Sequence, residues 1–228
     1  LRIAFLAGVD ERSGPSARAG SEEPGTAPLD VPRLSKQATE LRRRTDHVIV
    51  SLHWGAERFD IPAPAQIEQA RELIDAGATM ILGHHPHVLQ GLGYHRECPI
   101  AYSLGNFLAD DVWYDDGDVL RWNRTERTGC VLLADLGPDG YVGDVRQVGT
   151  RDDGRFVRLD DDAYSGRRIA RVNHRLARGV TLRRYRREHL RVKTIRPVLA
   201  HLRPSELRKL RWRNVRNAFA TIRGARHA

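Results

Sequence analysis

Histidines that follow apolar runs are the residues of this sequence best suited to chemistry. His53 ends the run at residues 47–53, and His85 and His87 follow a second run at residues 79–83. Neutral imidazole is the side chain that most often binds transition metals, and the His-x-His spacing in an extended segment places two rings on one side of the chain. A third histidine from a neighbouring strand would supply another corner of a metal site, suited to zinc, iron, manganese, cobalt or nickel.

A third polar segment of this kind follows the apolar run at residues 99–104. It reads Ser103-Leu104-Gly105-Asn106-Phe107, so that three apolar runs in succession end in histidine or asparagine. A single histidine of this type is more often an ordinary surface residue, but the recurrence favours a functional site. His47, His95 and His174 lack this context, and we interpret them as structural or solvated.

The apolar runs predict strands that alternate with amphipathic helices. Apolar residues at three- and four-residue spacing indicate helices, and β-branched runs bounded by turn residues indicate buried strands. The predicted strands cover residues 1–8, 47–53, 79–83 and 99–104, the predicted helices cover residues 31–45 and 65–76, and residues 130–136 and 141–145 flank a Gly-Pro-Asp-Gly hairpin turn. This order is that of an α/β fold, in which open sheets place their ligand sites at the carboxyl ends of the strands.

Long, ordered motifs give the sequence a resemblance to a known family. They read Ser-Leu-His-Trp-Gly-Ala-Glu at residues 51–57, Gly-His-His-Pro-His-Val-Leu-Gln at 83–90 and Tyr-Ser-Leu-Gly-Asn-Phe at 102–107. From residue 1 to about residue 145, the sequence resembles CapA-type poly-γ-glutamate capsule-synthesis proteins, which are related to calcineurin-like metallophosphoesterases. The resemblance implies part of a four-layer αββα sandwich.

The resemblance also implies roles for the histidines. His53 matches the lone histidine of the fourth metallophosphoesterase motif, and His85 and His87 match the paired histidines of the final motif. These three residues are therefore implied metal ligands of a catalytic centre. His84 occupies a position that varies in such motifs and ranks below its neighbours.

Residues near the histidines have supporting roles by the same resemblance. Asn106 joins the catalytic set, and Glu57 and Ser103 are implied to contact substrate or to support the ligands. The centre of a complete family member is expected to hold two divalent transition-metal ions, either manganese, iron or zinc. Such ions lower the pKa of a bound water and neutralise charge on a phosphoryl oxygen during hydrolysis.

The family pattern begins with segments that this sequence does not contain. A Gly-Asp strand end, an Asn-Leu-Glu segment and an Asn-Asn-His segment precede the strand that residues 1–8 resemble. We therefore expect a metal-dependent hydrolase site that is incomplete in this chain, and whether the protein is an enzyme depends on those ligands. The alternative is a non-catalytic accessory or scaffold protein of envelope-polymer assembly. The implied partners are an anionic envelope polymer, a phosphorylated small molecule and capsule-synthesis membrane proteins.

Charge is divided unevenly along the chain. Residues 167–228 contain 20 Lys and Arg against two Glu, a net charge of +18, whereas residues 1–166 carry −9. We predict a CapA-like domain over residues 1–150, a linker over 151–166 and an Arg-rich helical tail over 167–228, with a helix start at Pro204-Ser205-Glu206. The tail suits an anionic membrane surface or polyglutamate and lacks a nucleic-acid-binding motif. The alternative is a set of helices whose arginines simply face water.

Cysteines and targeting signals give little further information. Cys98 and Cys130 are too few for a disulfide framework or a cysteine-based zinc site. No stretch approaches the roughly 20 apolar residues that cross a bilayer, and no signal-peptide pattern opens the chain. Because the sequence starts at Leu1, we expect an upstream segment to have been removed, which leaves localisation open between the cytoplasm and the cell envelope of a bacterium.

Overall fold

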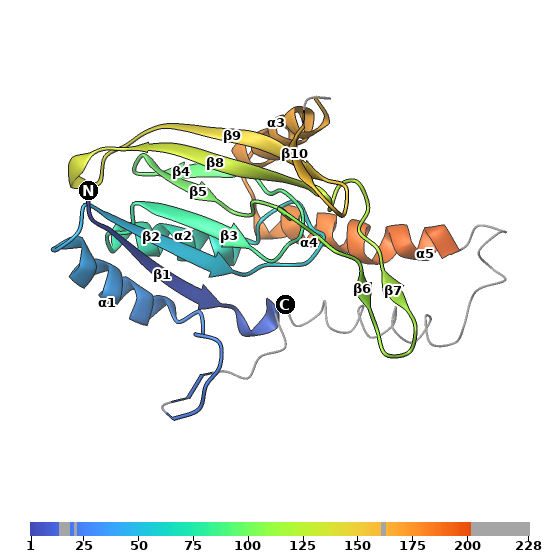
Figure 1. The fold of residues 1–228 in the computed structure, drawn as a ribbon, viewed down its shortest axis with the longest axis horizontal. Coiled ribbons are helices and arrows are strands. Elements are labelled where there is room, and N and C mark those ends of the chain that lie inside the picture. The colour runs from blue at the N-terminus through green and yellow to red at the C-terminus, as the bar shows by residue number, and fades with distance from the viewer. Residues whose placement is uncertain (14–18, 21, 161–162, 202–228) are drawn as a thin grey trace. The chain divides into compact units, whose positions relative to one another are not determined.

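The computed structural model describes residues 1–13, 19–20, 22–160 and 163–201. The chain divides into two compact units, Leu1–Gly179 and Val180–Ala228. Figure 1 shows the elements of both units along the chain. The described part of the first unit combines a five-stranded sheet, a three-stranded sheet and a two-stranded ribbon with three α-helices. The α/β class predicted from the sequence is confirmed.

The five-stranded sheet positions the histidine segments. Its strands, in spatial order, are β1 (Ile3–Val9), β2 (His47–His53), β3 (Met80–His84), β5 (Cys98–Ala101) and β4 (Leu92–His95). Strands β1, β2, β3 and β5 run parallel, and β4 runs antiparallel to β5. Because His53 pairs with His84 in the register of β2 and β3, both strands end at the same edge of the sheet.

Two helices cover one face of this sheet. Helix α1 (Val31–Arg42) begins at Asp30, whose carboxylate accepts a hydrogen bond from the backbone N–H of Arg33 at 3.0 Å. Helix α2 (Pro64–Asp75) packs beside it, and both bury one apolar stripe against the strands. The continuous β-branched sequence of β2 follows from this burial, since a strand covered on both faces has no solvent side.

A second, antiparallel sheet lies over the other face. It consists of β8 (Thr128–Leu136), β9 (Val142–Asp152) and β10 (Val157–Leu159). The predicted hairpin is confirmed: β8 and β9 are joined through a 3-10 turn at Pro138–Gly140. Strand β8 is at the edge of its sheet, and β1 is at the edge of the first.

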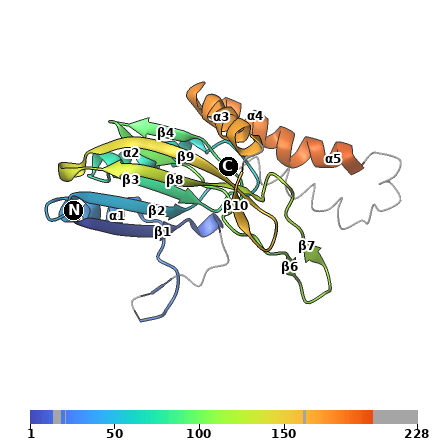
Figure 2. The ribbon, with the colours of Figure 1, turned by 45° about the horizontal axis from the view of Figure 1, so that its top comes forward.

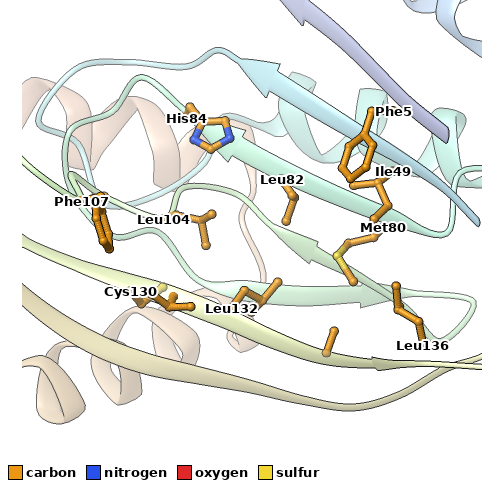
Figure 3. Close-up of a pocket in the computed structure, with 13 residues that line it drawn as sticks. Phe5, Ile49, Met80, Leu82, His84, Leu104, Phe107, Cys130, Leu132 and Leu136 are labelled. Atoms are coloured by element: carbon orange, nitrogen blue, oxygen red, sulfur yellow. The ribbon is translucent and has the colours of Figure 1, made fainter. Parts of the chain in front are cut away.

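An apolar cavity of about 470 Å³ separates the two sheets. Figure 3 shows its lining, with side chains of β2 and β3 on one side and side chains of β8 on the other. Phe5 of the edge strand β1 lies at its border and is 68% exposed. The inner faces of the two sheets are therefore incompletely covered by the described residues.

The segment between the second sheet and the tail is more ordered than the sequence predicted. Residues 151–166, predicted as a linker, contain the end of β9, strand β10 and the first turn of α3 (Tyr164–Ala177). Helix α3 belongs to the first unit and packs against β9 and β4, burying Val172. The division in the structure therefore follows Gly179, whereas the charge pattern placed the start of the tail at residue 167.

Three further pieces complete the described chain. A short 3-10 turn (Glu11–Ser13) follows β1, and strands β6 (Val112–Trp113) and β7 (Val119–Leu120) form the ribbon. In the second unit, α4 (Leu182–Leu190), a π-helical turn (Arg191–Ile195) and α5 (Arg196–His201) follow one another without a break. The helix start predicted at residues 204–206 lies outside the described residues. Among the helices that are described, none is long and apolar enough to span a membrane.

Candidate metal centre

Two loops meet at the carboxyl ends of β2 and β3. Residues 54–58 follow β2, residues 85–87 follow β3, and two backbone hydrogen bonds join the loops. Trp54 donates its backbone N–H to the carbonyl of His84 at 3.1 Å, and Arg58 donates its backbone N–H to the carbonyl of Pro86 at 2.7 Å. The parallel pairing of the strands therefore brings the two predicted histidine motifs together.

Glu57, His85 and His87 form the group that could hold a metal ion. One ligand atom from each residue lies within 4.8 Å of the others, with Glu57 exposed and both histidines half-buried. Nitrogen and oxygen donors on one zinc-like ion lie roughly 3–4 Å apart at the usual bond lengths, so small side-chain rotations would close this group around an ion. Two imidazoles and a carboxylate are also a donor set that zinc, iron and manganese accept.

His87 is held by Asn106. The amide of Asn106 donates through Nδ2 to the carbonyl of Glu126 at 3.1 Å, which leaves its Oδ1 facing His87 Nδ1 at 2.9 Å. Because an amide oxygen only accepts, Nδ1 of His87 must carry the proton. The Nε2 atom then keeps a lone pair, which is the arrangement found in histidines that bind metals.

His85 is held by His53. The distance between His85 Nδ1 and His53 Nε2 is 3.0 Å, and the same nitrogen of His53 lies 3.2 Å from the carbonyl of Ser13. Burial is the main cause that lowers the pKa of His85, the charge of His53 lowers it further, and Glu57 opposes both. A neutral His85 is the form that a metal ion requires.

The backbone of these loops is bent into the left-handed region. The φ angles are 95° at His85, 56° at His87 and 53° at Arg58, and glycines at positions 55 and 105 supply φ angles of 92° and 71°. A non-glycine residue in this region has an energetic cost and persists where the surroundings enforce it, which occurs often at functional sites. The strain therefore supports a functional role for these two loops.

A cationic and aromatic rim that sequence reasoning missed borders the histidines. The ring of Trp122 lies 4.9 Å from the ring of His87, and the guanidinium of Arg58 lies 5.7 Å from the Trp122 ring. Arg58 also pairs through Nε with the buried carboxylate of Glu126 at 2.9 Å, while 41% of its side chain stays exposed. The available signal was the acidic, aromatic composition of residues 110–126, which did not reveal that this loop folds back over the histidines.

The other predicted site residues lie around this group rather than in it. His53 contacts His85 but is not one of the three converging ligands. Ser103 is buried, and its hydroxyl accepts a hydrogen bond from the N–H of Gly105 at 3.3 Å. Glu57, predicted as a substrate contact, instead lies with His85 and His87.

His84 faces away from the centre. Alternate residues of a strand share a face, and His84 therefore lies with Leu82 and Met80 on the wall of the cavity between the sheets, as Figure 3 shows. Burial lowers the pKa of His84, and the charge of His53 lowers it further.

Comparison with known proteins finds sequence similarity to one family in the part of the chain that contains the histidine loops. Residues 1–111 match the sequence model of the family described as "Bacterial capsule synthesis protein PGA_cap". The chain is 40% identical over 117 residues to the capsule biosynthesis protein CapA of Bacillus anthracis, and 39% identical over 113 residues to the PGA biosynthesis protein CapA of Bacillus subtilis. These matches bear out the resemblance to CapA-type capsule-synthesis proteins over residues 1–111.

The matches cover only part of each protein. Each of the two Bacillus alignments spans 50% of this chain, and they span 28% and 30% of the relatives. A "Probable polyglutamine synthesis accessory protein" of Mycobacterium tuberculosis is 38% identical over 77 residues, which is 34% of this chain and 20% of that protein. The chain therefore spans less than a third of the length of these curated relatives.

Proposed function

We propose that this chain contributes the histidine side of a divalent-metal centre of the hydrolase type, in a protein that acts in capsule or poly-γ-glutamate synthesis. The observation that carries the proposal is the convergence of Glu57, His85 and His87 at the carboxyl ends of two adjacent parallel strands. The names of the relatives support the biological setting. A divalent ion bound there would act as a Lewis acid and lower the pKa of a coordinated water.

The residues around such an ion would have different roles. Glu57, His85 and His87 would hold it, and Asn106 would keep Nε2 of His87 directed toward it. His53 is within hydrogen-bonding distance of His85 and could orient that ligand or move a proton at Nε2. Among the residues that the structure describes, this is the one group of three such donors, so a second metal ion remains a prediction.

The rim indicates the class of substrate. Arg58 uses Nε to pair with Glu126, 41% of its side chain stays exposed, and it directly follows the candidate ligand Glu57 in the sequence. Guanidinium groups bind the oxygens of phosphate and carboxylate in pairs. We therefore favour an anionic substrate, either a phosphorylated small molecule or an anionic envelope polymer, over a neutral one.

Metal titration of the full 228-residue chain tests the centre. We expect Mn²⁺ or Zn²⁺ to bind in calorimetry, and His87→Ala and Glu57→Gln to weaken binding at least about tenfold, since each removes one ligand. His95→Ala is the matched control, because His95 pairs with Asp75 rather than with the group. Unchanged affinity in both ligand variants would refute this assignment.

A second experiment tests hydrolytic activity separately from metal binding. Turnover of a phosphomonoester or phosphodiester that requires the added metal and falls in His87→Ala would support the hydrolase reading. Metal binding without turnover of such substrates would instead support the non-catalytic accessory role, in which the fold is kept for assembly.

A further inference from the structure

The described helices of the second unit carry a dense positive charge. The whole unit contains 15 Lys and Arg residues against Glu188 and Glu206, a net charge of +13. Seven of the basic residues and Glu188 lie in the continuous helical run from α4 to α5, which Figure 2 shows. An anionic partner is therefore the first possibility to consider for this segment.

The exposed face of this run mixes arginine with large aliphatic side chains. One side of the run carries four exposed residues that are spaced three and four positions apart: Arg183, Arg187 and Leu190 in α4, and Arg191 at the start of the π-helical turn. Tyr185 is half-buried on another side. The exposed aliphatic side chains of the run, with their exposed fractions, are Leu182 (50%), Leu190 (44%), Ile195 (45%), Val198 (40%) and Leu199 (58%).

We propose that the α4–α5 segment binds the surface of an anionic lipid bilayer. Arginines would lie at the level of the lipid phosphates, while the aliphatic side chains enter the boundary of the acyl region. Long basic side chains allow this, because their stems lie along apolar surface while the charged ends remain in the polar layer.

The aliphatic side chains are the reason to favour a lipid surface over other anionic partners. Nucleic acid and polyglutamate would satisfy the arginines by counterion release, but neither offers an apolar layer that would cover five exposed aliphatic groups. The inference is independent of the proposed metal centre, because it uses only residues of the second unit.

Vesicle flotation of the full chain tests the proposal. We expect binding to vesicles of 70% phosphatidylcholine and 30% phosphatidylglycerol at 0.1 M NaCl, little binding to pure phosphatidylcholine, and weaker binding at 0.5 M NaCl. The triple variant Arg183→Glu, Arg187→Glu, Arg191→Glu should bind at least about tenfold more weakly. The corresponding Lys triple variant should keep most of the binding, because it preserves the charge.

Two further variants separate the causes. The first is a triple variant that changes the net charge equally but at exposed positions of the first unit: Arg33→Glu, Arg43→Glu and Arg155→Glu. It should weaken vesicle binding much less. The second is a triple variant that leaves the charge unchanged: Leu190→Ser, Ile195→Ser and Leu199→Ser. It should weaken vesicle binding at least about fivefold, because apolar burial is lost. Circular dichroism would verify that each variant keeps its helices.

Three outcomes would overturn the proposal. The first is wild-type protein that does not float with anionic vesicles. The second is an equal loss of vesicle binding in the α4–α5 charge variant and in the first-unit charge variant, which would show that only the net charge of the protein matters. The third is a Leu190→Ser, Ile195→Ser, Leu199→Ser variant that binds vesicles as tightly as wild type. If both proteins then also bound poly-γ-glutamate or duplex DNA equally well, the segment would be assigned to soluble polyanions.

Discussion

Asn106 acts on the candidate centre through the orientation of His87. Its amide is fixed by the carbonyl of Glu126, so the ring of His87 is held with the proton on Nδ1. Removing this contact leaves the ligand in place but frees the ring to rotate or to change its protonated nitrogen. The effect should therefore appear in metal affinity and not in folding.

We predict that Asn106→Ala lowers Mn²⁺ or Zn²⁺ affinity by about 10- to 100-fold, the range typical for loss of a residue that orients a ligand. Asn106→Asp keeps an acceptor for His87 and should lose less. Calorimetric titration of the three proteins measures the difference. Equal affinities for wild type and Asn106→Ala would show that His87 does not bind the ion through Nε2.

The two thiols should differ sharply in reactivity. Cys130 is buried beside Leu89 and Val172 and lines the cavity between the sheets, and burial raises its pKa to about 11. Burial also raises the pKa of Cys98, which is only half-buried. At pH 8, a pKa near 11 leaves Cys130 about a hundredfold less thiolate than a thiol at the ordinary value of 9.0, and thiolate is the reacting form. The deeper burial of Cys130 slows its reaction further. We predict that a disulfide reagent labels Cys98 first and Cys130 only slowly until the protein unfolds. Cys130→Ser should remove the slow phase, and loss of the fast phase in that variant would contradict the assignment.

The sequence predicted which motifs would meet, but not every side chain of the centre. The parallel strands bring His85 and His87 to the edge where strand ends were expected to gather. Arg58 and Trp122 were missed because they are 64 positions apart in the sequence and meet only through the return of the loop before β8. Ser103 could not be recognised as buried from its motif, because the burial of a polar side chain is set by the tertiary packing around it.

At the scale of elements, the long apolar runs were predicted well and the short or charged segments were not. β2 has the predicted bounds, because it contains a continuous Val-Ile-Val run and four of its seven residues are apolar. β4 was not predicted, since Leu92–His95 is only four residues long, contains a glycine and becomes a strand by pairing with β5. Helix α3 was assigned to the tail because its arginines resemble those that follow.

Those arginines attach α3 to the first unit. Arg168 and Arg175 both pair with Asp60, at 3.1 and 2.7 Å, and Asp60 lies 115 positions before Arg175 in the sequence. All three side chains are mostly buried, with exposed fractions between 14% and 21%. A charge pattern read along the sequence could not reveal this contact.

We predict that Asp60→Asn lowers the free energy of unfolding by about 1–3 kcal/mol, because two mostly buried guanidinium groups lose their counter-charge. Asp144→Asn is the matched control: Asp144 pairs with Arg146 at the surface, where both side chains are more than 60% exposed, and should change stability by less than about 0.5 kcal/mol. Urea unfolding of the two variants gives the comparison. If Asp60→Asn lowers the free energy of unfolding no more than Asp144→Asn does, α3 is held by its apolar side alone.

At the scale of the whole molecule, charge and fold divide the chain at different places. The first unit has 23 Lys and Arg against 27 Asp and Glu, and the second has a net charge of +13. The sequence placed the change near residue 167 because arginines become frequent there. The structure places it after Gly179, because α3 is a basic helix with an apolar side buried in the first unit.

We predict that residues 1–179 fold without the second unit. Their sheets, their buried clusters and the candidate centre all lie within Leu1–Gly179. A protein ending at Gly179 should show a melting temperature within a few degrees of that of the full chain and the same metal affinity, but should no longer float with anionic vesicles. A truncated protein that is unfolded by circular dichroism would show that the two units depend on each other.

The open side of β8 has a practical consequence for solutions of this protein. Beyond Cys130, the described residues give this nine-residue strand no partner on its outer side, and Leu133 on it is 43% exposed. Free backbone N–H and C=O groups in a row act as a template for the strand of a neighbouring molecule. The storage lifetime of a concentrated stock would then be set by strand addition between molecules, a process that rises with concentration and that a melting curve on a dilute sample does not measure.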